Sequence, residues 1–213
     1  MKIPFLSFDY QDVLYRNELI DAMSQVLDSK WYVMGKNLEL FEKNYADLHK
    51  TKYSLGVANG LDAITISLKT LGIKEGDEII VPSNTYIATW LAPSALGATI
   101  VPVEPNPKTY NIDPDKIEEA ITEKTKAIIP VHLYGQSCDM EKIMKIAEKY
   151  NLYVIEDNAQ AHLSTWNGKI TGSFGHINAT SFYPGKNLGA LGDGGGITTD
   201  IEVLAIKVRT YRN

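Results

Sequence analysis

The chain has 213 residues, of which 44% are hydrophobic and 22% charged, a composition typical of soluble globular proteins. Its formal net charge of −5 gives no reason to expect nucleic acid or an anionic membrane as a partner. Cys138 is the only cysteine, which excludes an intramolecular disulfide, and neither a signal peptide nor a membrane helix is indicated, so we expect a cytoplasmic protein.

The first fifty residues differ in pattern from the rest of the chain. Two helical patterns, over residues 15–29 and 37–50, are joined by residues 30–36. We expect residues 1–50 to form a helical arm that contacts another subunit. Residues 51–213 then form one large domain.

From residue 53 onward, short β-rich runs alternate with helical patterns. The expected strands cover residues 53–59, 78–83, 99–104, 127–135 and 152–159, and the helical patterns cover residues 60–72, 85–97, 114–124 and 139–151. Asp113 is the expected N-cap of the third helix, and Ile143, Ile146, Ala147 and Tyr150 are the expected inward face of the fourth.

This alternation predicts an α/β fold with right-handed crossovers and a mostly parallel central sheet flanked by helices. The continuous apolar runs at residues 78–81 and 152–155 fit strands that are buried on both faces. In open α/β sheets, ligands bind beyond the carboxyl ends of the strands. The informative residues should therefore follow strands directly.

Gly60 lies where the first expected strand meets a helix, and backbone N–H groups at a helix N-terminus favour a phosphate. A glycine there also serves the turn alone, and the dinucleotide and P-loop glycine patterns are absent. Tyr86 follows the second strand. It could stack on a planar ligand, although most aromatic residues at such positions belong to the core.

Asp157 directly follows an apolar strand, where a carboxylate is unfavourable unless it is paired or coordinated. A helix cap or a solvated charge would be the structural alternative. Gln160 lies three residues further on, so both side chains could face one pocket. His162 could be a third member, but the pattern favours a hydrogen-bonded structural histidine.

Lys186 lies among glycines in the stretch SFYPGKNLGALGDGG, residues 181–195. Taken alone, it could be a solvated loop lysine. Together with an acid (Asp157), a phosphate loop (Gly60) and an aromatic plate (Tyr86), it matches the needs of a pyridoxal phosphate site. The lysine forms an imine with the cofactor, the acid keeps the ring nitrogen protonated, and Ser181 can donate to the phosphate.

Four segments carry a family resemblance: NTYIAT (84–89), VHLYGQSCDM (131–140), VIEDNAQAH (154–162) and TSFYPGKNLGALGDGG (180–195). They resemble the signatures of the DegT/DnrJ/EryC1/StrS sugar aminotransferases. The resemblance implies the large domain of a fold type I pyridoxal phosphate enzyme, which works as a homodimer with its active site at the subunit interface.

The resemblance also implies roles for single residues. Lys186 matches the Schiff-base lysine and Asp157 the partner of the pyridinium nitrogen. Gln160 matches the residue that hydrogen-bonds the phenolic oxygen, Tyr86 the ring-stacking residue, and Tyr183 a residue that faces the sugar. The phosphate site is matched by Gly60, Leu61 and Ser181, and no metal is implied.

Where many members have Ser-Gly-Thr in the first phosphate loop, this chain has Asn59-Gly60-Leu61, so Leu61 offers only its backbone amide. Residues 59–62 and 109–114 resemble the subgroup that aminates carbon 3 of dTDP-3-keto-6-deoxyhexoses with L-glutamate as donor. Such enzymes make dTDP-3-amino-3,6-dideoxy-galactose or its gluco epimer for lipopolysaccharide or antibiotic sugars, and the residues do not separate the two epimers.

Two alternatives remain at this point. The first is a sugar dehydratase on the same fold, for which we expect histidine in place of Lys186. The second is a non-catalytic fragment, because the resemblance leads us to expect a longer chain with a C-terminal small domain, which we do not expect within these 213 residues. Asn213 matches a position from which an asparagine can contact the phosphate of the partner subunit.

Overall fold

The computed structural model describes residues 3–212, without the side chains of residues 10–12. The chain forms two compact units that divide between Phe41 and Glu42, inside helix α2 (Lys36–His49). The first unit contains α1 (Asp9–Ser29), which ends at Lys30 in the left-handed conformation. The role of residues 1–50 in a subunit contact stays a prediction.

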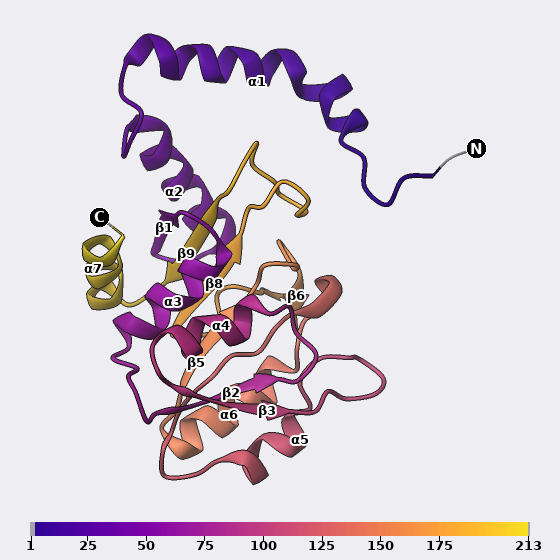
Figure 1. The fold of residues 1–213 in the computed structure, drawn as a ribbon, viewed down its shortest axis with the longest axis vertical. Coiled ribbons are helices and arrows are strands. Elements are labelled where there is room, and N and C mark those ends of the chain that lie inside the picture. The colour runs from indigo at the N-terminus through magenta and orange to yellow at the C-terminus, as the bar shows by residue number, and fades with distance from the viewer. Residues whose placement is uncertain (1–2, 213) are drawn as a thin grey trace. The chain divides into compact units, whose positions relative to one another are not determined.

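The second unit is built on a seven-stranded sheet, in the order β1-β9-β8-β5-β4-β2-β3. Neighbouring strands are parallel except β9, which is antiparallel to both β1 and β8, so the expected mostly parallel sheet is confirmed (Figure 1). The strands are β1 (Tyr53–Val57), β2 (Glu78–Pro82), β3 (Thr99–Val103), β4 (Thr125–Ile128), β5 (Tyr153–Asp157), β8 (Ile177–Ser181) and β9 (Gly195–Thr199). A separate hairpin joins β6 (Thr165–Trp166) to β7 (Lys169–Ile170).

Helices cover both faces of this sheet, as Figure 1 shows. They are α3 (Gly60–Thr70), α4 (Ala88–Ala95), α5 (Pro114–Ile117), α6 (Met140–Tyr150) and α7 (Glu202–Tyr211), with short 3-10 turns at η1 (Glu118–Ala120) and η2 (Leu133–Gly135). Strand alternation sends Ile79 and Val81 to the core under α3, α4 and α7, and Ile80 to the core under α5 and α6. The fold therefore buries its strands on both faces.

Several expected boundaries were wrong. The helix predicted over 114–124 ends at Ile117 and continues as η1, because Ile121 turns to an extended conformation; its predicted cap is confirmed, since the Asp113 side chain accepts the amide of Asp115. The strand predicted over 127–135 ends at Ile128, and Tyr134 adopts a left-handed conformation. On α6, Ile143 and Ala147 are buried as predicted, whereas Tyr150 at the last turn is exposed.

One edge of the sheet collects the residues that the sequence singled out. The parallel strands β1, β5 and β8 end at this edge in Val57, Asp157 and Ser181, and the antiparallel strand β9 begins there at Gly195. A ligand at this edge would meet the chain where each strand releases its backbone into a loop. Among the described residues, no helix is long and apolar enough to cross a bilayer.

Candidate active site

Asp157 is the last residue of β5 and is only 6% exposed. Its Oδ2 accepts a hydrogen bond from the Thr89 hydroxyl at 2.8 Å, and its Oδ1 accepts the amide of Ala159 at 3.1 Å. Burial raises the pKa of Asp157, and these two bonds together with the charge of Lys186 oppose that rise. Among the described residues, Asp157 forms no salt bridge, so its charge is held by neutral donors at close range.

Thr89 is a site residue that the sequence reasoning missed. It lies in the first turn of α4 and is buried, and its hydroxyl also lies 2.8 Å from that of Thr85. Thr85 lies in the bend before α4, so the contact between the two hydroxyls arises from the loop conformation, which the sequence pattern did not reveal. The pair orients the Asp157 carboxylate from the side of α4.

Lys186 lies in a tight turn after β8, where its amide donates to the Tyr183 carbonyl at 2.8 Å. Burial lowers the pKa of Lys186, and the nearby carboxylate of Asp157 counteracts part of that decrease. The two side chains are thus close enough for their charges to interact. A partly buried amine with a depressed pKa is the form of lysine that attacks carbonyl carbons.

The N-terminus of α3 faces the end of β8. Asn59 caps the helix, because its side chain accepts the amide of Asp62 at 2.8 Å. A Cβ at Gly60 would lie 2.8 Å from the Cβ of Ser181, and a Cβ at Gly195 would overlap the carbonyl of Asn59. Only glycine allows these backbones to meet so closely. The amides of Gly60 and Leu61 remain at the helix start without intrahelical partners.

Leu61 and Ser181 present different groups to this helix terminus. The Leu61 side chain packs against the core under α3, so only its backbone amide would be available to a ligand at the edge. Ser181 is 8% exposed, and its hydroxyl accepts the amide of Tyr183 at 3.3 Å. A hydroxyl that accepts from the backbone still carries its own proton as a donor.

The remaining predicted side chains lie on loops around the edge. Tyr86 and Tyr183 are 69% and 56% exposed, so neither is a core residue. Gln160 accepts the amide of Tyr134 through Oε1 at 2.8 Å, which orients its NH₂ group as the donor end.

Whether His162 is the hydrogen-bonded structural histidine that the pattern favoured stays a prediction. Its buried ring nitrogens have no partner that meets strict hydrogen-bond geometry, although an interaction with the Ser181 backbone opposes the effect of burial on its pKa. Burial, together with the charges of His49 and Lys186, lowers the pKa of His162 to about 4. The imidazole packs against Phe182 at a centroid distance of 5.6 Å, so a neutral ring lies beside the lysine loop.

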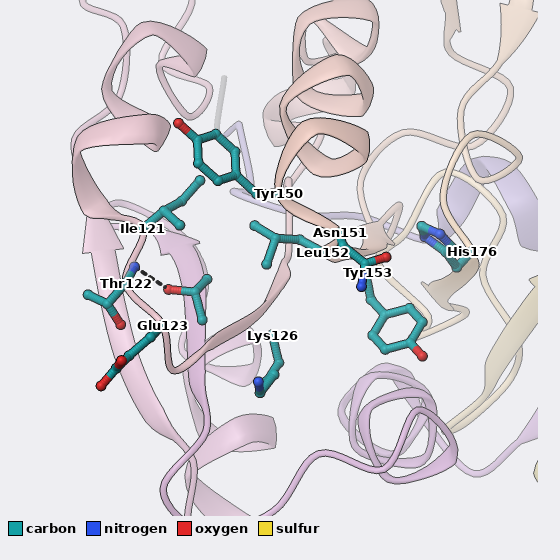
Figure 2. Close-up of a pocket in the computed structure, with 10 residues that line it drawn as sticks. Ile121, Thr122, Glu123, Lys126, Tyr150, Asn151, Leu152, Tyr153 and His176 are labelled. Atoms are coloured by element: carbon teal, nitrogen blue, oxygen red, sulfur yellow. Dashed lines mark hydrogen bonds between the residues drawn. The ribbon is translucent and has the colours of Figure 1, made fainter.

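A cavity of about 380 Å³ occurs elsewhere on the domain (Figure 2). Leu152, Tyr153 and His176 line it, together with residues just before and within β4, so it lies at the amino-terminal ends of β4, β5 and β8. Asp157 and Ser181 lie at the opposite ends of β5 and β8. The cavity is therefore separate from the candidate active site.

Comparison with known proteins decides the family. The model of the DegT/DnrJ/EryC1/StrS aminotransferase family matches residues 14–213. The chain belongs to this family. The resemblance carried by the four segments is thereby confirmed.

Individual family members are similar over the whole chain. The dTDP-3-amino-3,6-dideoxy-α-D-galactopyranose transaminase of Aneurinibacillus thermoaerophilus is 58% identical over 211 residues, which are 99% of this chain and 58% of that protein. The dTDP-3-amino-3,4,6-trideoxy-α-D-glucose transaminase of Streptomyces venezuelae is 46% identical over 212 residues, which are 100% of this chain and 56% of that protein. The chain thus spans a little over half the length of these curated relatives.

Solved structures of the family confirm the expected aminotransferase fold. S. venezuelae DesV superposes with a TM-score of 0.97 at 46% identity, covering 100% of this chain and 57% of that one. NtdA from Bacillus subtilis, crystallised with the bound cofactor PMP, superposes with a TM-score of 0.89 at 42% identity, covering 97% of this chain and 47% of that one.

Within this DegT/DnrJ/EryC1/StrS domain, the structure brings the acid, the lysine and the helix terminus to one edge of the sheet. Tyr86, Gln160 and Tyr183 lie on the loops that follow β2, β5 and β8. Asn213 lies outside the described residues.

Proposed function

We propose that this chain is the pyridoxal-phosphate-binding part of an aminotransferase. In this proposal, the enzyme moves an amino group from L-glutamate to carbon 3 of a dTDP-linked 3-keto-6-deoxyhexose. The observation that carries the proposal is that two ionisable groups share one edge of the sheet: Asp157, a buried carboxylate without a salt bridge among the described residues, and Lys186, an amine of lowered pKa.

The residues at this edge fit pyridoxal phosphate. A buried carboxylate is unfavourable without a cationic partner, and a protonated ring nitrogen would supply one to Asp157. The amides of Gly60 and Leu61, at the start of an eleven-residue helix, favour a phosphate, and the Ser181 hydroxyl lies against that helix start. Asp157 would thus meet the charged ring nitrogen of this cofactor, and the start of α3 would meet its phosphate.

Bound pyridoxal phosphate supplies an aldehyde carbon that combines with amines and a ring that accepts the electrons left when a C–H bond ionises. Lys186 would attach to that carbon through Nζ and, once displaced by the incoming amine, would accept the proton from the α-carbon of the amino donor. Asp157 would hold the proton on the ring nitrogen. Gln160 would donate its NH₂ group to the phenolic oxygen.

Two further side chains would contact the ligands: one would cover the face of the cofactor ring and the other would face the sugar. Tyr86 is exposed, so its ring is free to cover the cofactor, which would bury apolar surface on both partners. Tyr183 lies three residues before Lys186 and is exposed toward solvent, which suits a contact with an incoming sugar.

The choice of sugar rests on the relatives. The A. thermoaerophilus transaminase, at 58% identity, is named for a dTDP-linked 3-amino sugar, whereas relatives named for UDP-linked sugars are 41% and 43% identical. The dehydratase alternative is disfavoured because lysine, rather than histidine, occupies position 186. We further propose a cytoplasmic homodimer. The many exposed apolar side chains of α1 support a subunit contact.

A coupled assay tests this function. The protein at its natural length, loaded with pyridoxal phosphate, is incubated with L-glutamate and with each of the two dTDP-3-keto-6-deoxyhexose epimers, and the nucleotide sugars are analysed by mass spectrometry. We expect a dTDP-3-amino-3,6-dideoxyhexose from at least one epimer and an equal amount of 2-oxoglutarate. Loss of the sugar hydroxyl without gain of nitrogen would instead indicate the dehydratase.

A further inference from the structure

Glu156, the residue before Asp157, is a buried carboxylate that the proposed chemistry does not use. It is 0% exposed. Its Oε1 accepts the amides of Phe174 at 2.6 Å and Gly175 at 2.9 Å, and its Oε2 accepts the amide of Gly172 at 2.8 Å. These bonds tie the loop before β8 to the carboxyl end of β5.

The fourth donor to Glu156 comes from a different segment. His132 Nε2 lies 2.8 Å from Oε2, and His132 Nδ1 accepts the amide of Cys138 at 3.1 Å. Since Nδ1 accepts a hydrogen bond, the ring proton lies on Nε2 and is donated to Glu156. Four donors fill the acceptor capacity of one carboxylate. Burial alone would raise the pKa of Glu156, yet the bonds from His132, Gly175 and Gly172 hold it below its usual value.

The same His132 also fixes the backbone of Asp157. The His132 amide donates to the Asp157 carbonyl at 3.1 Å, and the Asp157 amide donates to the Pro130 carbonyl at 2.8 Å. Both backbone groups of Asp157 are therefore bonded to residues 130–132, which lie beyond the end of β4. Glu156 holds this segment in place through the imidazole.

Strand alternation separates the two carboxylates. Side chains of neighbouring strand residues point to opposite faces, so Glu156 faces away from Asp157, whose own side chain meets Thr89 of α4. Glu156 cannot replace Asp157 as the partner of a ligand at the edge. It can only set where the end of β5 lies.

We infer that Glu156 is a positioning residue for Asp157: with His132 it clamps the end of β5 between the segment 130–138 and the loop 172–175. The clamp sets the depth and direction of the Asp157 carboxylate. This inference rests on the proposed function, since it assigns Asp157 the role of holding the ring nitrogen of pyridoxal phosphate.

Glu156→Gln is the direct test, because the amide has one acceptor oxygen in place of two and turns an NH₂ group toward backbone donors. Glu141→Gln, on the exposed face of α6, is the matched control. In the protein at its natural length and free of cofactor, we expect E156Q to accelerate hydrogen exchange at the amides of His132 and Asp157 at least tenfold. The E141Q control should leave both rates unchanged.

The dissociation constant of pyridoxal phosphate provides the second readout. We expect it to rise at least tenfold in E156Q and in Asp157→Asn, while the double variant binds no more than about threefold more weakly than the weaker-binding single variant. Such non-additivity is the sign that two residues act as one unit. If Glu156 had a purely structural role, the factors by which the two single substitutions raise the dissociation constant would multiply in the double variant.

If E156Q does not fold, His132→Gln takes its place, because it removes the imidazole from the clamp. We expect the same faster amide exchange and the same non-additive loss of cofactor binding with D157N. Unchanged exchange at Asp157, or effects on cofactor binding that multiply with those of D157N, would overturn the inference. A wild-type protein that binds no pyridoxal phosphate would overturn the proposed function instead, and the exchange rates would then decide the clamp alone.

Discussion

At the scale of single residues, the candidate site keeps two ionisable groups away from their ordinary behaviour. Burial raises the pKa of Asp157 and lowers that of Lys186, and each charge partly compensates the other. Strong perturbation of neighbouring groups is typical of functional sites. Such groups make the ligand-free protein less stable, and a bound ligand then supplies the charge partner that they lack.

We predict that Asp157→Asn stabilises the cofactor-free protein or leaves its melting temperature unchanged at pH 7. The raised pKa means that folding disfavours the ionised form of Asp157. The protein therefore becomes less stable as the pH rises through the folded-state pKa of this residue. The same variant should bind pyridoxal phosphate about 10- to 100-fold more weakly, because a hydrogen bond to a charged group contributes about 1.5–3 kcal/mol. Thermal melts and cofactor titrations check both parts.

The control for this variant is Asp115→Asn, which removes an exposed carboxylate paired with Lys142. It should change neither quantity appreciably, since exposed pairs contribute little. A destabilised D157N protein with normal cofactor affinity would show that Asp157 is a structural cap and not the cofactor's partner.

We predict that Lys186 reacts with an amine-specific acylating reagent at a lower pH than Lys145 does. Burial lowers the pKa of Lys186, whereas the hydrogen bond to Glu141 raises that of Lys145. The neutral amine is the reactive form, so a lower pKa means that a larger fraction of Lys186 is neutral at a given pH. Competitive labelling of the cofactor-free protein over pH 7–10, read by mass spectrometry, measures both midpoints; equal midpoints would contradict the prediction.

At the scale of elements, the site depends on how closely α3 approaches the ends of β8 and β9. Gly60 lies against Ser181, and Gly195 lies against Asn59. These contacts put the first amides of α3 next to the chain that leads to Lys186. The glycines are therefore required by backbone clearance between elements that are far apart in the sequence.

We predict that Gly60→Ala destabilises the protein by about 1–3 kcal/mol, because the added Cβ meets that of Ser181 at 2.8 Å and α3 must shift. The shift should also weaken binding of inorganic phosphate and of pyridoxal phosphate. Gly192→Ala is the matched control, since no atom lies within 4 Å of its added Cβ. Denaturant unfolding and phosphate titration measure the effects; equal stability of the two variants would rule out the close approach.

At the scale of the whole molecule, the alternating pattern was enough to predict the α/β class and the mostly parallel sheet, and it also gave the edge of the sheet at which the candidate site was sought. It did not reveal β9, because Gly195–Thr199 contains one strongly apolar residue and pairs antiparallel both with β8, the strand before it, and with β1, which is distant in sequence. Nor could it reveal the hydrogen bond from Thr89 to Asp157, which joins residues 68 positions apart. Local pattern determines elements, whereas pairing order and side-chain contacts arise from packing.

Acid sensitivity is a property of the whole fold to which His162 contributes. Its pKa of about 4 in the folded state lies below the ordinary 6.5, so the unfolded chain binds the proton first and stability falls as the pH drops from about 6.5 toward 4. We predict that any melting-temperature deficit of His162→Gln at pH 7 shrinks as the pH is lowered to 5. A deficit that stays constant over this range would show that His162 is not held neutral.

The central claim is that Lys186 carries the cofactor in this site. Reduction of the pyridoxal-phosphate-loaded protein with borohydride makes a lysine–cofactor bond permanent, and peptide mass spectrometry then locates it. We expect one phosphopyridoxyl group per chain, on the peptide that contains Lys186, and none on that position in Lys186→Ala. A label on other lysines with Lys186 unmodified would show that Lys186 does not carry the cofactor.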